Sequence, residues 1–120
     1  MKNATYEIKK SIFIGIYENV TSVNEVEEKF ENLKKEHKRA THICFAYKIK
    51  LNGVEQVKFF DDGEPTGTAG RPILSVIEKK GLFNIVVFVV RYFGGVKLGS
   101  GGLLRAYSKT TSMVLKNENN

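Results

Sequence analysis

The sequence predicts one α+β domain, with its elements in the order β-α-β-β-α-β-α. Three observations predict this class: a helix-capping pair before a helical repeat, an Asn-Gly turn between two apolar runs, and an unbroken β-branched run near residue 88. With 120 residues, 42% of them hydrophobic and 27% charged, the chain has the size and composition of a folded domain. No repeat, linker or shift in composition divides it, so we expect a single domain over residues 1–120.

The first third of the chain predicts a strand followed by a helix. Residues 5–18 read as an extended segment with one or more breaks, because apolar side chains recur on both sides of Gly15. Ser22 and Glu25 have the spacing of a capping box, which marks the first turn of a helix. This helix should bury the residues that recur at helical spacing, which are Val23, Val26, Phe30 and Leu33.

The middle of the chain predicts a β-hairpin. Thr41–Lys50 and Glu55–Phe60 are expected as its two strands. Asn52-Gly53 stands between them, and this dipeptide is the strongest short-range signal of a hairpin turn.

The last third predicts helix, strand and helix. Pro72 suits the opening residue of a short helix, and Gly81 suits its C-terminal cap. Asn84–Tyr92 is β-branched and apolar without alternation, which predicts a central strand covered on both faces. A closing helix should bury Leu103, Tyr107, Thr111 and Val114.

Two glycine-rich loops separate these elements, Asp61–Pro72 (DDGEPTGTAGRP) and Arg91–Tyr107 (RYFGGVKLGSGGLLRAY). Each leads into a predicted helix, and free backbone N–H groups at a helix start form a natural anion site beside basic side chains. The alternative is that the glycines only permit tight turns and the cations are solvated. The residues predicted to bind an anion or nucleic acid are Arg71, Arg91, Gly94, Gly95, Lys97, Gly99, Gly101, Gly102 and Arg105.

Named phosphate and nucleophile motifs do not fit the second loop. A Walker loop requires Ser or Thr where Leu98 follows Lys97. A dinucleotide fingerprint read from Gly99 requires Gly or Ala at Leu104, and a nucleophile elbow around Ser100 requires Gly at Leu98. Ser100 is therefore expected to cap the last helix, and no catalytic residue is assigned.

The first loop carries an acidic cluster, Asp61, Asp62 and Glu64. Such carboxylates can hold magnesium together with water and substrate phosphates, or they can cap turns. His42 can lie near them across the hairpin, although the spacing does not require it, and a catalytic His42 is one alternative. His42 and Cys44 lack the further ligands of a zinc site, so we assign no metal and no cofactor.

The net charge of +6 is unevenly placed along the chain. No acid stands between Gly81 and Asn117, where five cations do, so this segment can attract an anionic partner or only aid solubility. The N-terminus lacks the apolar core of a signal peptide, and no apolar run reaches the length of a membrane span. A cytoplasmic protein without a membrane partner is expected, and a single cysteine fits a reducing compartment. The oligomeric state is left open.

The two glycine-rich segments carry a resemblance to a known family. Asp61–Leu74 (DDGEPTGTAGRPIL) and Val89–Ser108 (VVRYFGGVKLGSGGLLRAYS) closely resemble the signature segments of the IMPACT/YigZ family, as a single N-terminal-type domain. The resemblance implies a fold similar to the second domain of ribosomal protein S5: a two-layer sandwich with a four-stranded mixed sheet, helices on one face and a left-handed βαβ crossover. The apolar run Ile85–Val90 then requires a cover for the second face, from the chain or from a partner.

The resemblance also implies a role in translation. Eukaryotic relatives resemble regulators that bind the activator of an initiation-factor kinase, and bacterial relatives are suggested to bind nucleic acid. We therefore expect a non-catalytic module that binds RNA or a ribosome-associated factor through the basic glycine loops. Two alternatives stay open: a regulator that acts by protein contact, and an enzyme for a small phosphorylated substrate with Asp61, Asp62 or Glu64 as base or metal ligand.

Overall fold

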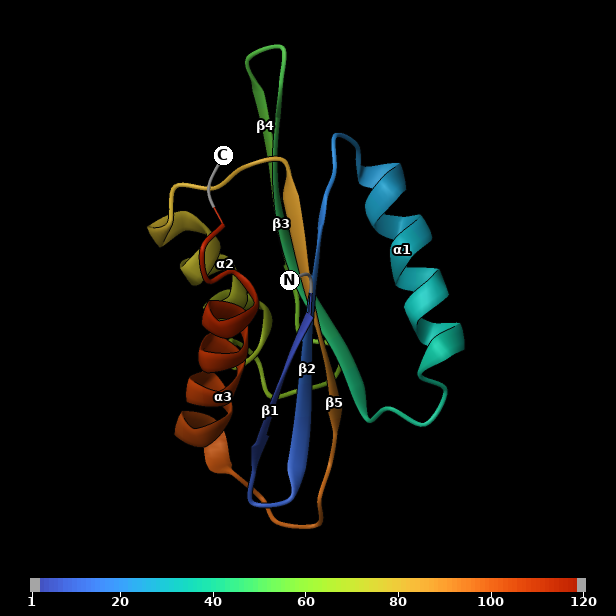
Figure 1. Cartoon of the computed structure of the whole chain (residues 1–120), viewed down its shortest axis with the longest axis vertical. Helices are drawn as coiled ribbons and strands as arrows, with labels where there is room; N and C mark the ends of the chain where they lie inside the picture. Colours follow the sequence, from blue (N-terminus) through green and yellow to red (C-terminus); the bar gives the residue numbers. More distant parts are fainter. Residues whose placement is uncertain (1–2, 119–120) are drawn as a thin grey trace.

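A computed structural model describes residues 3–118 and confirms an α+β fold. Its single sheet has five strands in the order β1-β2-β5-β3-β4, and every neighbouring pair is antiparallel (Figure 1). The elements in chain order are β1 (Asn3–Ile8), β2 (Ser11–Asn19), α1 (Val23–Glu36), β3 (His42–Leu51), β4 (Val54–Phe60), α2 (Gly70–Lys79), β5 (Ile85–Tyr92) and α3 (Gly99–Val114).

Helices cover both faces of the sheet, which corrects the expected arrangement with helices on one face. α1 packs on one face, and α2 and α3 pack together on the other (Figure 1). Ile85–Val90 of β5 has no exposed surface, because its side chains alternate between the two resulting cores. The prediction of a central strand covered on both faces is confirmed, and α1 supplies the cover.

The sheet has five strands rather than the expected four, because the first extended segment is a hairpin. β1 and β2 pair antiparallel, and Lys9 and Lys10 form the two-residue turn between them. Both lysines have positive φ, 47° and 68°, as a type I′ turn requires. Lysine disfavours that conformation, so the sequence carries no turn signal at this position.

The sheet is antiparallel rather than mixed, because β3 lies between the two strands of the crossover. β4 and β5 run in the same direction and are joined through α2, yet each pairs with β3 and not with the other. The expected βαβ unit therefore exists, but its two parallel strands are not neighbours.

Two local predictions are confirmed, the capping box of α1 and the Asn-Gly turn. The Ser22 hydroxyl accepts the N–H of Glu25 at the start of α1, and the Glu25 carboxylate accepts the N–H of Thr21. Asn52 and Gly53 have φ of 52° and 76° between β3 and β4. Within residues 3–118, no helix is both long enough and apolar enough to span a bilayer.

Candidate functional site

The two glycine-rich loops meet around one cavity. It has a volume of about 440 Å³, and its walls include Glu64 and Pro65 from the first loop and Lys97–Ser100 from the second. The start of β3 and the end of β5 complete it. We call it the loop cavity. Its lining residues are Thr41, His42, Glu64, Pro65, Arg91, Phe93, Lys97, Leu98, Gly99, Ser100 and Leu103.

A buried ion pair forms one wall of the loop cavity. The side chains of Glu64 and Arg91 are only 3% and 6% exposed, and Arg91 Nη1 donates to both carboxylate oxygens at 2.8 and 2.9 Å. The Tyr107 hydroxyl donates to Oε2 of the same carboxylate. Arg91 was predicted to bind phosphate, but its charge is used inside the protein, where Ser11 accepts a further bond from Nη2.

His42 stands between this ion pair and the first loop. Its Nδ1 lies 2.7 Å from the carbonyl oxygen of Asp62, and a carbonyl only accepts, so Nδ1 carries a proton. Its Nε2 lies 3.5 Å from Oε1 of Glu64 and at the edge of the cavity. The imidazole is therefore fixed in orientation, with one nitrogen directed toward the buried carboxylate.

Behind the cavity, Cys44 and Tyr107 are buried and stay protonated. Burial raises the pKa of the Cys44 thiol, and the nearby carboxylate of Glu64 raises it further. Burial likewise raises the pKa of the Tyr107 hydroxyl, with Cys44 and Glu64 adding to the effect. A thiol held in its protonated form is a poor nucleophile, so Cys44 does not resemble a catalytic cysteine.

The carboxylates of the first loop are engaged in holding that loop. Asp61 accepts the backbone N–H groups of Gly67, Ala69 and Gly70, which fixes the loop against the first turn of α2. Asp62 accepts the N–H of Ile43 at 2.6 Å. Over residues 3–118, no three His, Cys, Asp or Glu side chains gather in the way that a metal ion needs.

A second hollow lies between α3 and the β1–β2 hairpin and carries only positive charge. Its volume is about 510 Å³, and three of its lining side chains are the cations Lys9, Arg105 and Lys109. No acid lines it. We call it the basic groove, and its full lining is Tyr6, Ile8, Lys9, Leu98, Gly102, Arg105, Ala106 and Lys109.

Gly94 allows the second loop to pack closely against the β1–β2 turn beside the groove. A Cβ on Gly94 would stand 2.1 Å from the backbone of Lys10, so only glycine lets this loop lie against the β1–β2 turn. Gly99 begins α3 with φ +72°, and Leu98 at the N-cap offers no side-chain hydrogen bond. The prediction that Ser100 caps the helix is wrong, because Ser100 already lies inside its first turn.

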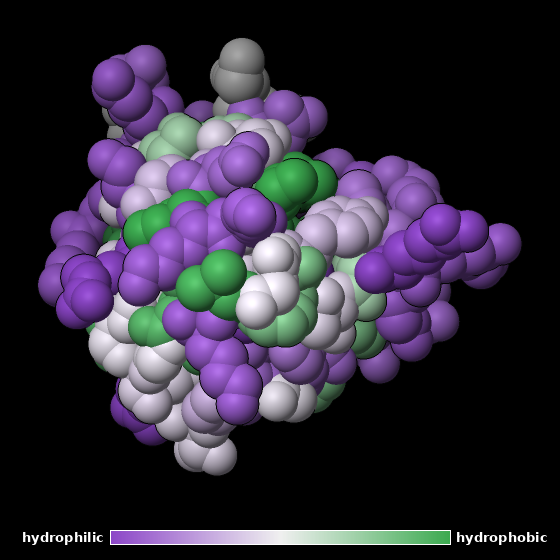
Figure 2. All heavy atoms as spheres, turned by 90° about the horizontal axis from the view of Figure 1, so that it is seen from below, coloured by the Kyte–Doolittle hydropathy of each residue, from purple (hydrophilic) through white to green (hydrophobic). Residues whose placement is uncertain are grey.

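The predicted basic residues do not all gather at one place. Lys97 is exposed on the loop cavity and Arg105 on the basic groove. The loop between β5 and α3 lies at the lower end of the molecule in Figure 1. Figure 2 views this end, where hydrophobic atoms (green) lie among hydrophilic ones (purple). Arg71 lies on α2 over the ring of Phe59 and lines a separate hollow on the other side of α3.

Sequence reasoning missed part of the groove. Lys9 and Lys109 were not among the predicted site residues, although Lys109 stands in the acid-free segment of the second half. The pairing of Lys9 with α3 had no sequence signal, because it depends on the unexpected hairpin.

Comparisons with known proteins agree with this fold. The Impact N-terminal domain matches residues 9–115. The IMPACT family member YvyE of Bacillus subtilis is 50% identical over 105 residues, which cover 88% of this chain and 48% of that protein. The chain thus spans about half the length of this relative.

Two solved structures are also similar. A crystal structure of a hypothetical protein superimposes with a TM-score of 0.90 at 38% identity, over 95% of this chain and 56% of that one. The two-domain translational regulator Yih1 gives a TM-score of 0.58 at 24% identity, over 97% of this chain and 45% of that one, and shows the shared fold. Because the domain match spans almost the whole sequence and YvyE shares half of its aligned residues, the chain belongs to the IMPACT family.

Proposed function

We propose that this domain binds single-stranded or looped RNA through the basic groove. The observation that carries the proposal is the convergence of Lys9, Arg105 and Lys109 on one hollow that no acid lines. A phosphate backbone is attracted to such a surface, and each contact releases condensed counterions.

The chemistry around the groove also suits bases. Phe93 is 47% exposed at the same end of the molecule, and Tyr6 lies on the groove itself. Unpaired bases stack on aromatic side chains, and this makes binding tolerant of sequence. Of the other aromatic residues near the second loop, Tyr107 is buried, and the Tyr92 hydroxyl lies 2.6 Å from His37 Nδ1.

The strained turn gives further support. Lys9 and Lys10 hold positive φ, which costs each lysine about 1 kcal/mol or more, where Asn-Gly is favourable. Strain of this kind is often retained for function. A role in translation is consistent with the name of the structural relative Yih1, a translational regulator.

The test compares two charge-matched double variants. Arg105→Ala/Lys109→Ala removes two cations from the groove, and Lys34→Ala/Lys35→Ala removes two from α1, on the opposite face of the sheet. Fluorescence anisotropy with a labelled RNA of about 12 nucleotides would be measured from about 50 to about 200 mM salt. We expect the groove variant to bind more weakly and to lower the slope of log K against log salt by about 1.4, and the α1 variant to match wild type.

Two outcomes would contradict RNA binding through the basic groove. Equal loss in both variants would reveal a non-specific effect of net charge and contradict the groove. No RNA binding at low salt would overturn the proposal and favour a protein partner.

A small phosphorylated ligand is the second candidate, because the loop cavity unites both glycine loops, His42 and Lys97. The test is a titration with inorganic phosphate followed by NMR. Shifts of the Ser100 and Gly101 amide signals that are equal in wild type and in Arg105→Ala/Lys109→Ala would favour this candidate. Loss of that response in Lys97→Ala would assign it to the cavity.

A further inference from the structure

β4 is an edge strand that leaves apolar side chains in solvent. Val54, Val57 and Phe59 are 62%, 41% and 39% exposed, and Leu51 at the end of β3 is 45% exposed. Most of the large hydrophobic side chains exposed within residues 3–118 therefore lie on the β3–β4 hairpin. Edge strands are usually protected by charge, bulges or a covering element. β4 carries the charges of Glu55 and Lys58, and Arg71 of α2 lies over the ring of Phe59, yet its apolar side chains stay exposed and could be covered by a partner.

The backbone of β4 is also ready to pair. In the ladder with β3, Leu51 and Val54 close the two-residue turn as a hydrogen-bonded pair, and such pairs recur at every second residue. The N–H and C=O groups of Glu55, Val57 and Phe59 therefore point away from β3. Across residues 3–118, the backbone bonds of turns, loops and caps do not involve any residue of β4.

We propose that β4 pairs antiparallel with β4 of a second copy of the chain, around a two-fold axis at Val57. The two sheets would then join into one continuous sheet. This proposal is independent of the RNA-binding groove, which lies at the opposite edge of the sheet, beside β1.

The register follows from parity and charge. A two-fold axis perpendicular to the sheet keeps the two α1-covered faces on the same side, so opposed residues must share a face. An axis at Val57 sets Val57 against its own copy, Val54 against the partner's Phe60, and Gln56 against the partner's Lys58. It sets Phe59 against the partner's Glu55, whose methylene groups can lie along the ring. The backbone N–H and C=O groups of Glu55, Val57 and Phe59 that point away from β3 then all form hydrogen bonds with the partner's β4.

Neighbouring registers are worse. An axis at Lys58 would place two lysines directly opposite each other, which is destabilising. An axis at Gln56 would set Phe59 against the partner's turn residue Gly53 and leave its apolar side chain uncovered.

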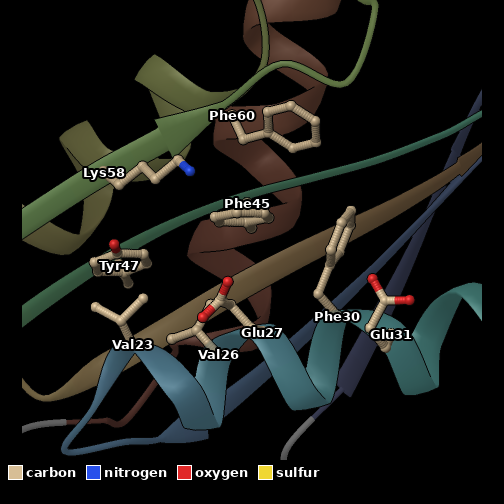
Figure 3. Close-up of a pocket in the computed structure, with 9 residues that line it drawn as sticks. All are labelled: Val23, Val26, Glu27, Phe30, Glu31, Phe45, Tyr47, Lys58 and Phe60. Carbon is tan, nitrogen blue, oxygen red and sulfur yellow. The ribbon is translucent and has the colours of Figure 1, made fainter.

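The groove shown in Figure 3 borders this edge and fits the same partner. It has a volume of about 270 Å³ between α1 and the β3–β4 hairpin, and the rings of Phe30, Phe45 and Phe60 converge in it. In the proposed register, the partner's Val54 lies beside Phe60 and extends this apolar surface. α1 leaves β4 uncovered here, since Lys58 and Phe60 of β4 form the open wall of the groove.

The experiment measures molar mass and a position-specific cross-link with the full chain. Sedimentation equilibrium of wild type should give twice the monomer mass of 13.5 kDa as the concentration rises. Val57→Lys places two charges together on the axis and should give a monomer at every concentration. The matched control is Leu104→Lys, a substitution at an exposed residue of α3 (47%) that should leave the dimer intact.

A disulfide reports the register directly. Cα atoms of a hydrogen-bonded antiparallel pair lie about 5.5 Å apart, within the range that a disulfide spans. Val57→Cys should therefore form a covalent dimer on mild oxidation, whereas Leu104→Cys and wild type should not, because the native Cys44 is buried.

Two results would overturn the proposal. One is a wild-type chain that stays monomeric up to about 1 mM, a concentration at which even a Kd of about 1 mM would show. The other is a dimer that persists in Val57→Lys. A strand from a different protein on this edge would give the first result, and a dimer through another face would give the second.

Discussion

The ion pair between Glu64 and Arg91 is the single interaction on which the candidate site most depends. It is almost fully buried, and two unit charges lose most of their hydration at such a position. The two hydrogen bonds from Arg91 Nη1, the Tyr107 hydroxyl and His42 together replace that hydration around the carboxylate. The pair therefore holds the two glycine loops together, since Glu64 belongs to the first and Arg91 begins the second.

Glu64→Gln is expected to destabilise the fold strongly. It leaves the Arg91 guanidinium buried without a counter-charge, so the free energy of unfolding should fall by about 3–5 kcal/mol. Urea denaturation followed by circular dichroism measures this loss. The control is Glu31→Gln, which breaks an exposed pair with Lys34 and should change stability by about 0.5 kcal/mol or less. A Glu64→Gln/Arg91→Met double variant should recover part of the loss, and equal effects at Glu64 and Glu31 would contradict the argument.

At the scale of elements, the β1–β2 hairpin decides which cations can act together. Its turn brings Lys9 beside α3, and the close contact between Gly94 and Lys10 fixes the second loop against it. The hairpin is thus both a structural part of the sheet and one wall of the basic groove. Lys9 supplies charge to the groove, and both turn lysines hold a positive φ that is unfavourable for lysine.

Lys9→Asn/Lys10→Gly should separate these two roles. Asn-Gly favours the positive φ that the turn requires, so the melting temperature should rise, with a gain of about 1 kcal/mol or more. RNA affinity should fall, because two cations are lost near the groove. Thermal unfolding and anisotropy on the same samples measure both effects.

Lys9→Arg/Lys10→Arg is the matched control, since it keeps the charge and the strain and should change neither quantity much. An Asn-Gly variant that gains stability and binds RNA as wild type does would exclude the hairpin from the interface.

At the scale of the whole molecule, one sheet carries two cores. Phe13, Ile73 and Tyr107 belong to the core under α2 and α3, and Leu33 belongs to the core under α1. Both cores rest on β5, whose apolar residues alternate between them. The two sides of the sheet should therefore unfold together.

Leu33→Ala and Ile73→Ala test this coupling from opposite faces. Both side chains are buried, so each truncation should cost about 2–5 kcal/mol. In each variant, far-ultraviolet circular dichroism and tyrosine fluorescence should show one coincident transition. A separate early transition in Leu33→Ala alone would mean that α1 and its core unfold independently.

Three expectations drawn from the sequence concern the fold family, the handedness of the crossover and the cellular location. The likeness to ribosomal protein S5, the left-handed crossover and a cytoplasmic location stay predictions.

The sequence by itself determined the elements whose signals are local. The capping box at Ser22, the Asn52-Gly53 turn and the apolar run of β5 each depend on a few neighbouring residues, and the structure has all three. Glycine content and charge likewise located both loops, and family resemblance followed from the same segments. These features are readable because backbone conformation and burial impose a fixed spacing on residue types.

Only the tertiary structure decided which charges face water and which face each other. Arg91 and Lys97 look alike in the sequence, yet one is buried against Glu64 and the other is exposed on the loop cavity. The Lys9-Lys10 turn, the cover that α1 gives to the second face, and the bare edge of β4 depend in the same way on pairing between distant segments. Long-range contacts carry no local signature, because the free energy that selects them is a property of the packed sheet and not of any one segment.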